Sequence, residues 1–238
     1  MGSKAAQTAQ ALTCIYDRLF DRYGPQHWWP GETPFEVIIG TILTQSTAWT
    51  NVEKAVANLK SEGLLDAMSL DEIATDKLAE LIRPSGYYNA KAAKLKAFVE
   101  RLTREYDGSL NRLFELETGE LRNELLSIHG IGPETADSIL LYAAHRPVFV
   151  IDAYTKRIIG RLGLAPSSDS YESFQQLFME RLPHDEGMFN EYHALFVRHG
   201  KEVCRKSPRC EDCCLANLPK KRCPSAEGPG RLGRSHFL

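Results

Sequence analysis

The residues of this 238-residue chain best suited to chemistry are two carboxylates that follow a glycine-rich turn. Gly132 directly precedes Pro133, and Gly130 lies two residues before Gly132. Glycines at this spacing let the backbone bend and expose consecutive N–H groups. A helix that begins at Pro133 adds the positive end of its dipole, so the turn predicts a clamp for phosphate groups. Glu134 lies in the first turn of that helix, and Asp152 follows 18 residues later.

Asp152 is the candidate catalytic residue. A carboxylate can stabilise positive charge that develops during a reaction, and it can orient or deprotonate an attacking water. The alternative role is structural, as the N-cap of a helix over residues 153–162. The two roles are compatible, because a capped aspartate is held in a fixed orientation.

All three tryptophans of the chain lie close together in the sequence, at Trp28, Trp29 and Trp49. Trp28 and Trp29 belong to the loop His27–Pro30, which can face a ligand, whereas the helical position of Trp49 is equally typical of a core residue. Indole faces attract cations with about 0.5–2 kcal/mol. The tryptophans are therefore candidates to line a ligand site by stacking.

Five of the six cysteines lie within twenty residues of one another. Such crowding in a cytosolic chain favours metal or iron–sulfur ligation over disulfides, because thiolates are the ligands that these centres use. A zinc ion held by four thiolates is the competing interpretation. The clustered cysteines are Cys204, Cys210, Cys213, Cys214 and Cys223, and the sixth, Cys14, is expected in the core.

The elements that position these residues are predicted to be helices, so the expected fold class is all-α. Apolar residues recur at spacings of three and four, and breaks in this pattern delimit about ten short helices. The best strand candidate, Pro147–Ile151, is five residues long and leads straight to Asp152. It is expected to be a buried linker.

The composition is that of a soluble globular protein, with 43% hydrophobic and 25% charged residues. No apolar run is long enough to span a bilayer, and the N-terminus lacks a basic segment followed by an apolar one, so we expect a cytoplasmic protein without a membrane partner. The net charge is −2, yet residues 201–234 carry nine Lys and Arg against four Asp and Glu. This basic segment favours nucleic-acid binding, with a solvated charged tail as the alternative.

The hairpin sequence resembles that of the helix-hairpin-helix DNA glycosylases of the endonuclease III superfamily, in which L-x-G-[IV]-G-x-x-T-A precedes a catalytic aspartate. Ile128 replaces the leucine of this pattern, and Thr135 matches its threonine. In the bifunctional members, a lysine whose amine attacks the sugar occupies the position of Glu134. A carboxylate cannot form a Schiff base, so the resemblance implies a glycosylase without strong AP lyase activity.

The resemblance covers nearly the whole chain and implies a two-domain architecture with the active site in the cleft between the domains. A six-helix barrel domain that contains the hairpin is expected over residues 31–145. Residues 1–30 and 146–223 are expected to form the second domain, which carries an iron–sulfur cluster loop. The Gly-, Pro- and Ser-rich segment 224–238 is expected to be a disordered tail.

Relatives carry a [4Fe–4S] cluster on a C-x6-C-x2-C-x5-C loop, after a helix that ends in H-G-x3-C. This chain has the same helix end at His199–Cys204, followed by gaps of five, two and nine residues between its cysteines. The cluster is expected to fix a loop whose basic side chains meet DNA. The implied ligands are Cys204, Cys210, Cys213 and Cys223, with Cys214 as an alternative third ligand.

The resemblance also implies that one nucleotide is rotated out of the duplex, which leaves a gap in the base stack. Gln45 and Tyr87 lie in segments that match the family's wedge segments and are expected to fill this gap, although Gln45 alone would suit a polar helix surface. Lys91 is expected either to contact a backbone phosphate or to be solvated. The hairpin glycines are expected to bind phosphate around a monovalent cation. The candidate DNA-binding residues are Gln45, Tyr87, Lys91, Gly130, Gly132 and Thr135.

Trp28, Trp29, Trp49 and Glu134 make the chain most similar to the endonuclease-III-like 3-methyladenine DNA glycosylase branch. The implied function is hydrolysis of the N-glycosidic bond of alkylated purines, with Asp152 stabilising the oxocarbenium-like sugar and Glu134 acting in pocket electrostatics or water positioning. The implied partner is damaged double-stranded DNA, bound by a nucleoid-associated monomer. The alternatives are a bifunctional glycosylase/AP lyase for oxidised pyrimidines, an enzyme for mismatched uracil or thymine, and a non-catalytic DNA-binding iron–sulfur protein.

Overall fold

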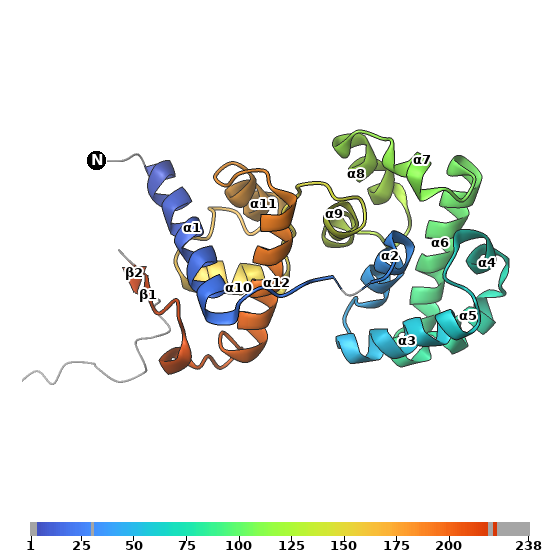
Figure 1. Ribbon diagram of the computed structural model, residues 1–238, viewed down its shortest axis with the longest axis horizontal. Coiled ribbons are helices and arrows are strands. Elements are labelled where there is room, and N and C mark those ends of the chain that lie inside the picture. Colours follow the sequence, from blue (N-terminus) through green and yellow to red (C-terminus); the bar gives the residue numbers. More distant parts are fainter. Residues whose placement is uncertain (1–3, 30, 219–220, 223–238) are drawn as a thin grey trace, which may run out of the picture. The chain divides into compact units, whose positions relative to one another are not determined.

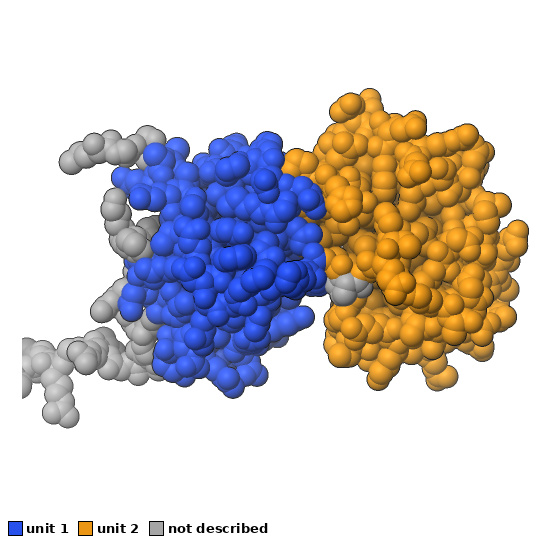
Figure 2. Space-filling view, in the orientation of Figure 1, with its two compact units in different colours: residues 1–28, 151–238 blue, residues 29–150 orange. Residues whose placement is uncertain are grey.

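The structure is a computed structural model that describes residues 4–29, 31–218 and 221–222. Helices make up nearly all of its regular structure, as Figure 1 shows, so the predicted helical class is confirmed. The chain divides into two compact units, coloured separately in Figure 2: unit 1 is Met1–Trp28 with Ile151–Leu238, and unit 2 is Trp29–Val150. The predicted tail 224–238 and Cys223 lie outside the described residues.

Unit 1 is organised around its helix α12, which packs against α1 and α10. Apolar residues at spacings of three and four place Phe189, Tyr192 and Phe196 on one buried face of α12. The Tyr192 hydroxyl donates to the carbonyl of Leu12 at 2.8 Å and so ties α12 to α1. A short antiparallel strand pair, β1–β2, was not predicted. The described elements are α1 (Lys4–Tyr23), α10 (Ala153–Arg161), α11 (Tyr171–Met179), α12 (Glu186–Glu202), the 3-10 helix η2 (Cys210–Asp212), β1 (Asn217–Leu218) and β2 (Lys221–Arg222).

Unit 2 surrounds the helix α2, whose residues from Val37 to Leu43 are all buried and which packs against α3, α6 and α9 (Figure 1). Its described residues form eight α-helices where six were expected, and three of the eight are short helices of five to seven residues. Two of these begin at side-chain N-caps, Asp66 and Ser109. The elements are α2 (Pro34–Leu43), α3 (Trp49–Ser61), α4 (Ala67–Glu72), α5 (Thr75–Leu81), the 3-10 helix η1 (Arg83–Ser85), α6 (Tyr88–Tyr106), α7 (Leu110–Phe114), α8 (Thr118–Ser127) and α9 (Pro133–Tyr142).

The segment between α9 and α10 has no regular structure, and residues 148–151 are buried, which agrees with the predicted linker. The guanidinium of Arg146 donates to the carbonyl of Phe114 at 2.8 Å, so the start of the linker is attached to unit 2. The unit boundary therefore falls after Val150, whereas the sequence suggested residue 145. Within the described part of the chain, no helix combines the length and the apolar character needed to cross a membrane.

Candidate active site

The hairpin joins α8 to α9, and only one of its two glycines requires glycine for its backbone conformation. Gly130 has a φ of +84°, in the left-handed region, and a Cβ there would overlap the side chain of Lys94. Gly132 has an extended backbone with a φ of −93°, and a Cβ there would meet nothing within 4 Å beyond its chain neighbours. Gly132 is the N-cap of α9, and no side chain caps this helix. The first-turn N–H groups are therefore not engaged by a capping side chain, which is what a phosphate site requires.

An ion pair between a partly buried arginine and a buried aspartate connects the two helices on either side of the hairpin. Arg122 on α8 donates from Nε and Nη2 to the two carboxylate oxygens of Asp137 on α9, at 2.7 and 3.1 Å. Asp137 is fully buried. This two-bond geometry fixes the angle between the helices as well as their separation. The pair was not predicted, although an aspartate within the apolar face of α9 was a signal for it.

Gln45 is hydrogen-bonded through both ends of its amide, to the hairpin by its nitrogen and to Lys94 of α6 by its oxygen. Its Nε2 donates to the carbonyl of Gly130 at 3.2 Å and to the hydroxyl of Thr135 at 2.9 Å, and its Oε1 accepts from Nζ of Lys94. Gln45 lies in the turn after α2, not on a helix as expected. Its assignment as a wedge stays a prediction, because these bonds describe how the side chain is held in the absence of DNA.

Thr135 is buried, so its side chain holds Gln45 and does not face solvent. The role of Thr135 in DNA binding stays a prediction, and because the side chain is buried, such a contact would come from its backbone. One of the hairpin carbonyls expected to surround a cation, that of Gly130, accepts a hydrogen bond from Gln45. The Thr135 hydroxyl and the Gly130 carbonyl therefore both accept hydrogen bonds from Gln45.

Lys91 contradicts both of its predicted roles, phosphate contact and solvation. Its side chain is 2% exposed, and Nζ donates to the carbonyls of Leu43 at 2.8 Å and Ser85 at 2.6 Å. Burial lowers the pKa of Lys91 to about 8, and the charge of Lys94 acts in the same direction. Lys91 thus connects the end of α2 to η1. Its place four residues before Leu95, on the apolar face of α6, was the signal that it would be buried.

Tyr87 and Glu134 are both open to solvent. Tyr87 is 75% exposed and is the N-cap of α6, with a left-handed φ of +46°. A strained backbone that presents an exposed aromatic ring is consistent with a wedge, which stays a prediction. Glu134 lies exposed in the first turn of α9, where a carboxylate stabilises the helix dipole.

Asp152 occupies the predicted N-cap position of α10, and it is buried. Its Oδ1 accepts the backbone N–H of Thr155 at 2.7 Å. Its Oδ2 lies 3.7 Å from Nε2 of His193, a residue of α12 that the sequence analysis missed. Burial lowers the pKa of His193, with Asp152 opposing that shift, so its ring is neutral at neutral pH. A histidine inside the aromatic face of α12 was the available signal.

The adjacent residues Trp28 and Trp29 belong to different units. Trp28 stacks on His193 in unit 1, with ring centroids 5.6 Å apart and planes 13° apart. Trp29 meets Trp49 edge to face in unit 2, at 5.0 Å and 84°. The predicted group of three tryptophans is therefore divided between a ring that supports His193 and a pair that lines a cavity.

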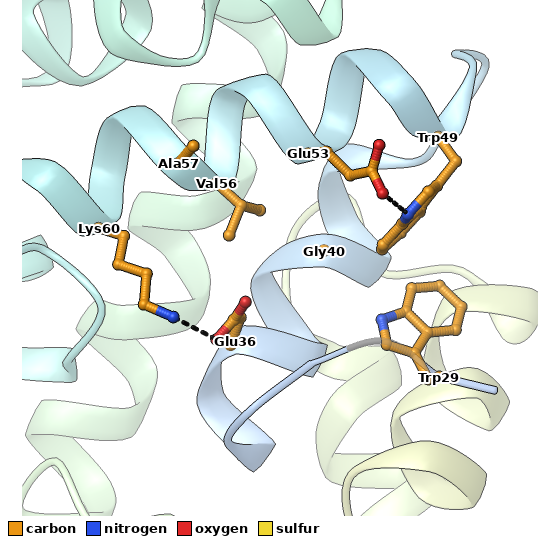
Figure 3. Close-up of a pocket in the computed structure, with 8 residues that line it drawn as sticks. All are labelled: Trp29, Glu36, Gly40, Trp49, Glu53, Val56, Ala57 and Lys60. Carbon is orange, nitrogen blue, oxygen red and sulfur yellow. Dashed lines mark hydrogen bonds and ion pairs between the residues drawn. The ribbon is translucent and has the colours of Figure 1, made fainter. Parts of the chain in front are cut away.

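The cavity in unit 2 has a volume of about 160 Å³ and combines indole rings with carboxylates (Figure 3). Trp29 and Trp49 form one wall, and Nε1 of Trp49 donates to Glu53 at 2.9 Å. A Cβ on Gly40 would lie only 3.4 Å from the Trp49 ring, so the missing side chain leaves space for both indoles. The charged residues that line the cavity are Glu36, Glu53 and Lys60, and Glu134 does not contribute to it.

Comparison with known proteins identifies the family. Residues 39–184, which include the hairpin and Asp152, match the model of the HhH-GPD superfamily base excision DNA repair proteins. The chain belongs to this superfamily of DNA glycosylases. "Putative DNA repair glycosylase MJ1434" of Methanocaldococcus jannaschii is 49% identical over 84% of this chain and 91% of its own length. Endonuclease III of Thermotoga maritima is 30% identical over 77% of this chain and 81% of its own.

Solved glycosylase structures share the fold. The Helicobacter pylori 3-methyladenine DNA glycosylase bound to 1,N6-ethenoadenine is 28% identical, with a TM-score of 0.70 over 84% of this chain and 98% of that one. A non-covalent endonuclease III–DNA complex has a TM-score of 0.77 over 92% and 96% at 23% identity, which shows the fold alone. The expected helix-hairpin-helix glycosylase fold is thereby confirmed.

The cysteine loop follows the part of the HhH-GPD glycosylase that the family model matches. Arginines hold this loop: Arg161 contacts Sγ of Cys204 at 3.3 Å, and Arg157 donates to the carbonyl of Cys204 at 2.8 Å. Sγ of Cys213 lies 3.5 Å from Nε2 of His199. Among the described residues, no three His, Cys, Asp or Glu side chains are placed to hold a metal ion. The fourth predicted ligand, Cys223, is not among them.

Proposed function

We propose that this HhH-GPD protein is a monofunctional glycosylase that removes alkylated purines such as 3-methyladenine from DNA. The observation that carries the proposal is the cavity of unit 2, in which Trp29 and Trp49 are accompanied by Glu36 and Glu53. An N-alkylated purine is a flat cation, and indole faces attract it by about 0.5–2 kcal/mol more than a neutral base. The carboxylates also attract a positively charged base. The positive charge of Lys60, close to Glu36, offsets part of this attraction.

Asp152 is proposed to carry the chemical step. As the glycosidic bond of the flipped nucleotide stretches, the sugar gains positive charge that this carboxylate stabilises, and the same group orients or deprotonates the attacking water. Its N-cap bond to Thr155 holds it in one place before the substrate arrives. A cationic base is already a good leaving group, so no general acid is required.

The absence of lyase chemistry is proposed from Glu134. This residue presents a carboxylate at the hairpin position where bifunctional relatives have a lysine, and a carboxylate cannot form a Schiff base with the sugar. The role of Glu134 in base selection is less direct than expected, because the carboxylates that line the cavity are Glu36 and Glu53. Of its two expected roles, water positioning is therefore the one that we propose for Glu134.

We retain the [4Fe–4S] cluster as a proposal, with Cys204, Cys210, Cys213 and Cys223 as its ligands. The donor chemistry fits, because thiolates are the ligands of such clusters and three of the four lie within ten residues of the loop. The cluster would hold the loop and its basic side chains in place. Purified protein is expected to be yellow-brown, with equal iron and sulfide by chemical analysis; zinc in their place would contradict the proposal.

Damaged double-stranded DNA is the proposed partner of a monomer that acts in the cytoplasm on the nucleoid. The open backbone at Gly132 and the exposed ring of Tyr87 support this proposal, as do the basic residues of the cysteine loop. Arg205, Lys206 and Arg209 are exposed in this loop, and Lys201 is exposed at the end of α12. A monovalent cation at the hairpin is part of the same proposal.

The test is incubation with alkylated, oxidised and deaminated duplexes, followed by strand analysis with and without hot alkali. The expected result is release of methylated purines, with strand breakage only after alkali. Breakage without alkali, together with a covalent adduct trapped by borohydride, would instead establish a bifunctional enzyme of the endonuclease III type. No base release from any duplex would identify a non-catalytic DNA-binding protein.

A further inference from the structure

Asp152 faces a histidine that the proposed mechanism does not use. His193 is 5% exposed and lies on the face of α12 that carries the buried rings of Phe189 and Phe196. A polar ring at such a position loses its hydration, which is unfavourable unless a polar group compensates. The charged group opposite its Nε2 is the carboxylate of Asp152, 3.7 Å away.

The carboxylate of Asp152 has one oxygen held by a short hydrogen bond. Oδ1 accepts the N–H of Thr155 at 2.7 Å, whereas Oδ2 is the atom that faces His193. A single bond fixes the position of one oxygen but leaves the carboxylate plane able to turn about it. A group that must meet a sugar on one side and a water on another depends on the direction of that plane.

His193 can provide a second donor without adding charge. Its buried ring is neutral at neutral pH, so one nitrogen carries hydrogen and the other does not. Trp28 lies nearly parallel to this ring, at 5.6 Å and 13°, and restricts its rotation. The ring is therefore held with Nε2 toward Asp152.

We infer that His193 is a positioning residue for Asp152, whose Nε2–H donates to Oδ2 and sets the plane of the carboxylate when the damaged nucleotide is bound. The present 3.7 Å separation is longer than a hydrogen bond, and such contacts commonly shorten in the substrate complex. The inference rests on the proposed function and adds to it a residue that touches neither base nor sugar.

Two substitutions distinguish the hydrogen-bond donor of His193 from its aromatic ring. His193→Phe keeps an aromatic ring under Trp28 and removes the donor, whereas His193→Gln keeps an amide N–H at about the reach of Nε2 and removes the ring. The measurement is release of methylated purine from an alkylated duplex under single-turnover conditions, together with the Kd for that duplex. His184→Phe is the matched control, because His184 is an exposed histidine of the same unit.

The expected result is a roughly 10- to 100-fold lower release rate for His193→Phe with an unchanged Kd, because a misdirected catalytic group costs rate and not binding. His193→Gln should recover most of the rate, and His184→Phe should match the parent. His193→Leu is measured alongside, and it should lose the rate as His193→Phe does, so that overpacking by phenylalanine does not decide the outcome.

Three outcomes would overturn the inference: full release by His193→Phe, loss in His193→Gln as large as in His193→Phe, or loss confined to DNA binding. Asp152→Asn is included to separate this inference from the function on which it rests. If Asp152→Asn releases base normally, the proposed mechanism itself fails. If Asp152→Asn is inactive while His193→Phe is active, only the role of His193 is wrong.

Discussion

The Asp152 site of unit 1 and the hairpin of unit 2 are built in opposite ways. In the hairpin, polar side chains bond to one another and to the turn itself. In the Asp152 site, one carboxylate oxygen is held by its cap and the other only faces an imidazole. The hairpin network consists of Gln45, Lys94, Gly130 and Thr135, and the Asp152 site consists of Trp28, Asp152 and His193.

The difference follows from the role that we propose for each region. A phosphate clamp works through backbone N–H groups, so its side chains serve best when they stabilise the turn and leave the backbone exposed. A carboxylate that performs chemistry must keep an oxygen available, so it cannot be fully bonded in the free protein. Side-chain substitutions should therefore reduce rate in the Asp152 site, and stability or binding around the hairpin.

The largest effect is expected from Asp152→Asn. Asparagine keeps the side-chain oxygen that caps α10 but loses the charge, so folding should be retained. The single-turnover rate of base release should fall by at least about 100- to 1,000-fold, the usual cost of losing a transition-state electrostatic partner. Binding to a damaged duplex, followed by gel shift, should persist. A variant that binds no DNA would show that Asp152 acts in binding instead.

A smaller effect, on stability and DNA affinity, is expected from Gly130→Ala. The methyl group would overlap the side chain of Lys94 at a left-handed φ of +84°, so the turn or this side chain must shift. The free energy of unfolding should fall by about 1–3 kcal/mol in denaturant titrations, and duplex binding should weaken. Gly132→Ala is the matched control for stability, because its methyl group meets open space. Equal losses of stability in both variants would contradict the distinction between the glycines.

The smallest effect, visible mainly as a pH dependence of stability, is expected from Lys91→Met. Lys91 connects the end of α2 to η1. Folded Lys91 has a pKa of about 8, whereas the unfolded chain holds this proton to about pH 10.4. Between these values the unfolded state binds more protons, so the stability of the parent relative to the variant should rise with pH. The neutral amine still has two N–H donors for the carbonyls of Leu43 and Ser85.

Denaturant titrations from pH 7 to 10 check this prediction, with Lys54→Met, an exposed lysine of α3, as control. The free energy of unfolding of the parent should rise with pH relative to that of Lys91→Met. Relative to Lys54→Met, it should stay constant over the same pH range. A parent whose stability falls relative to Lys91→Met over this range would show that the folded protein retains the proton on Lys91.

The features predicted correctly from the sequence are those encoded within a few residues. The glycine-proline turn before α9 and the cap at Asp152 depend on local backbone geometry and on one side chain that reaches the next turn. The buried linker before Asp152 was also evident, from its continuous apolar run. The wrong predictions for Lys91 concern a side chain whose partners are distant in sequence, such as the carbonyl of Leu43. The hydrogen bond between Gln45 and Thr135 was not foreseen for the same reason.

The local sequence was thus sufficient for the helical class, the hairpin and the orientation of the Asp152 carboxylate toward its own helix. Tertiary structure decided which groups surround them. His193 reaches Asp152 across 41 residues of chain, and the neighbours Trp28 and Trp29 pack in different units, because burial of each ring depends on helices that are remote in sequence. The periodicity and spacing of residues in a sequence describe one helix or turn at a time. Which side chains lose water, and which hydrogen-bond partners they find, is decided only where helices pack together.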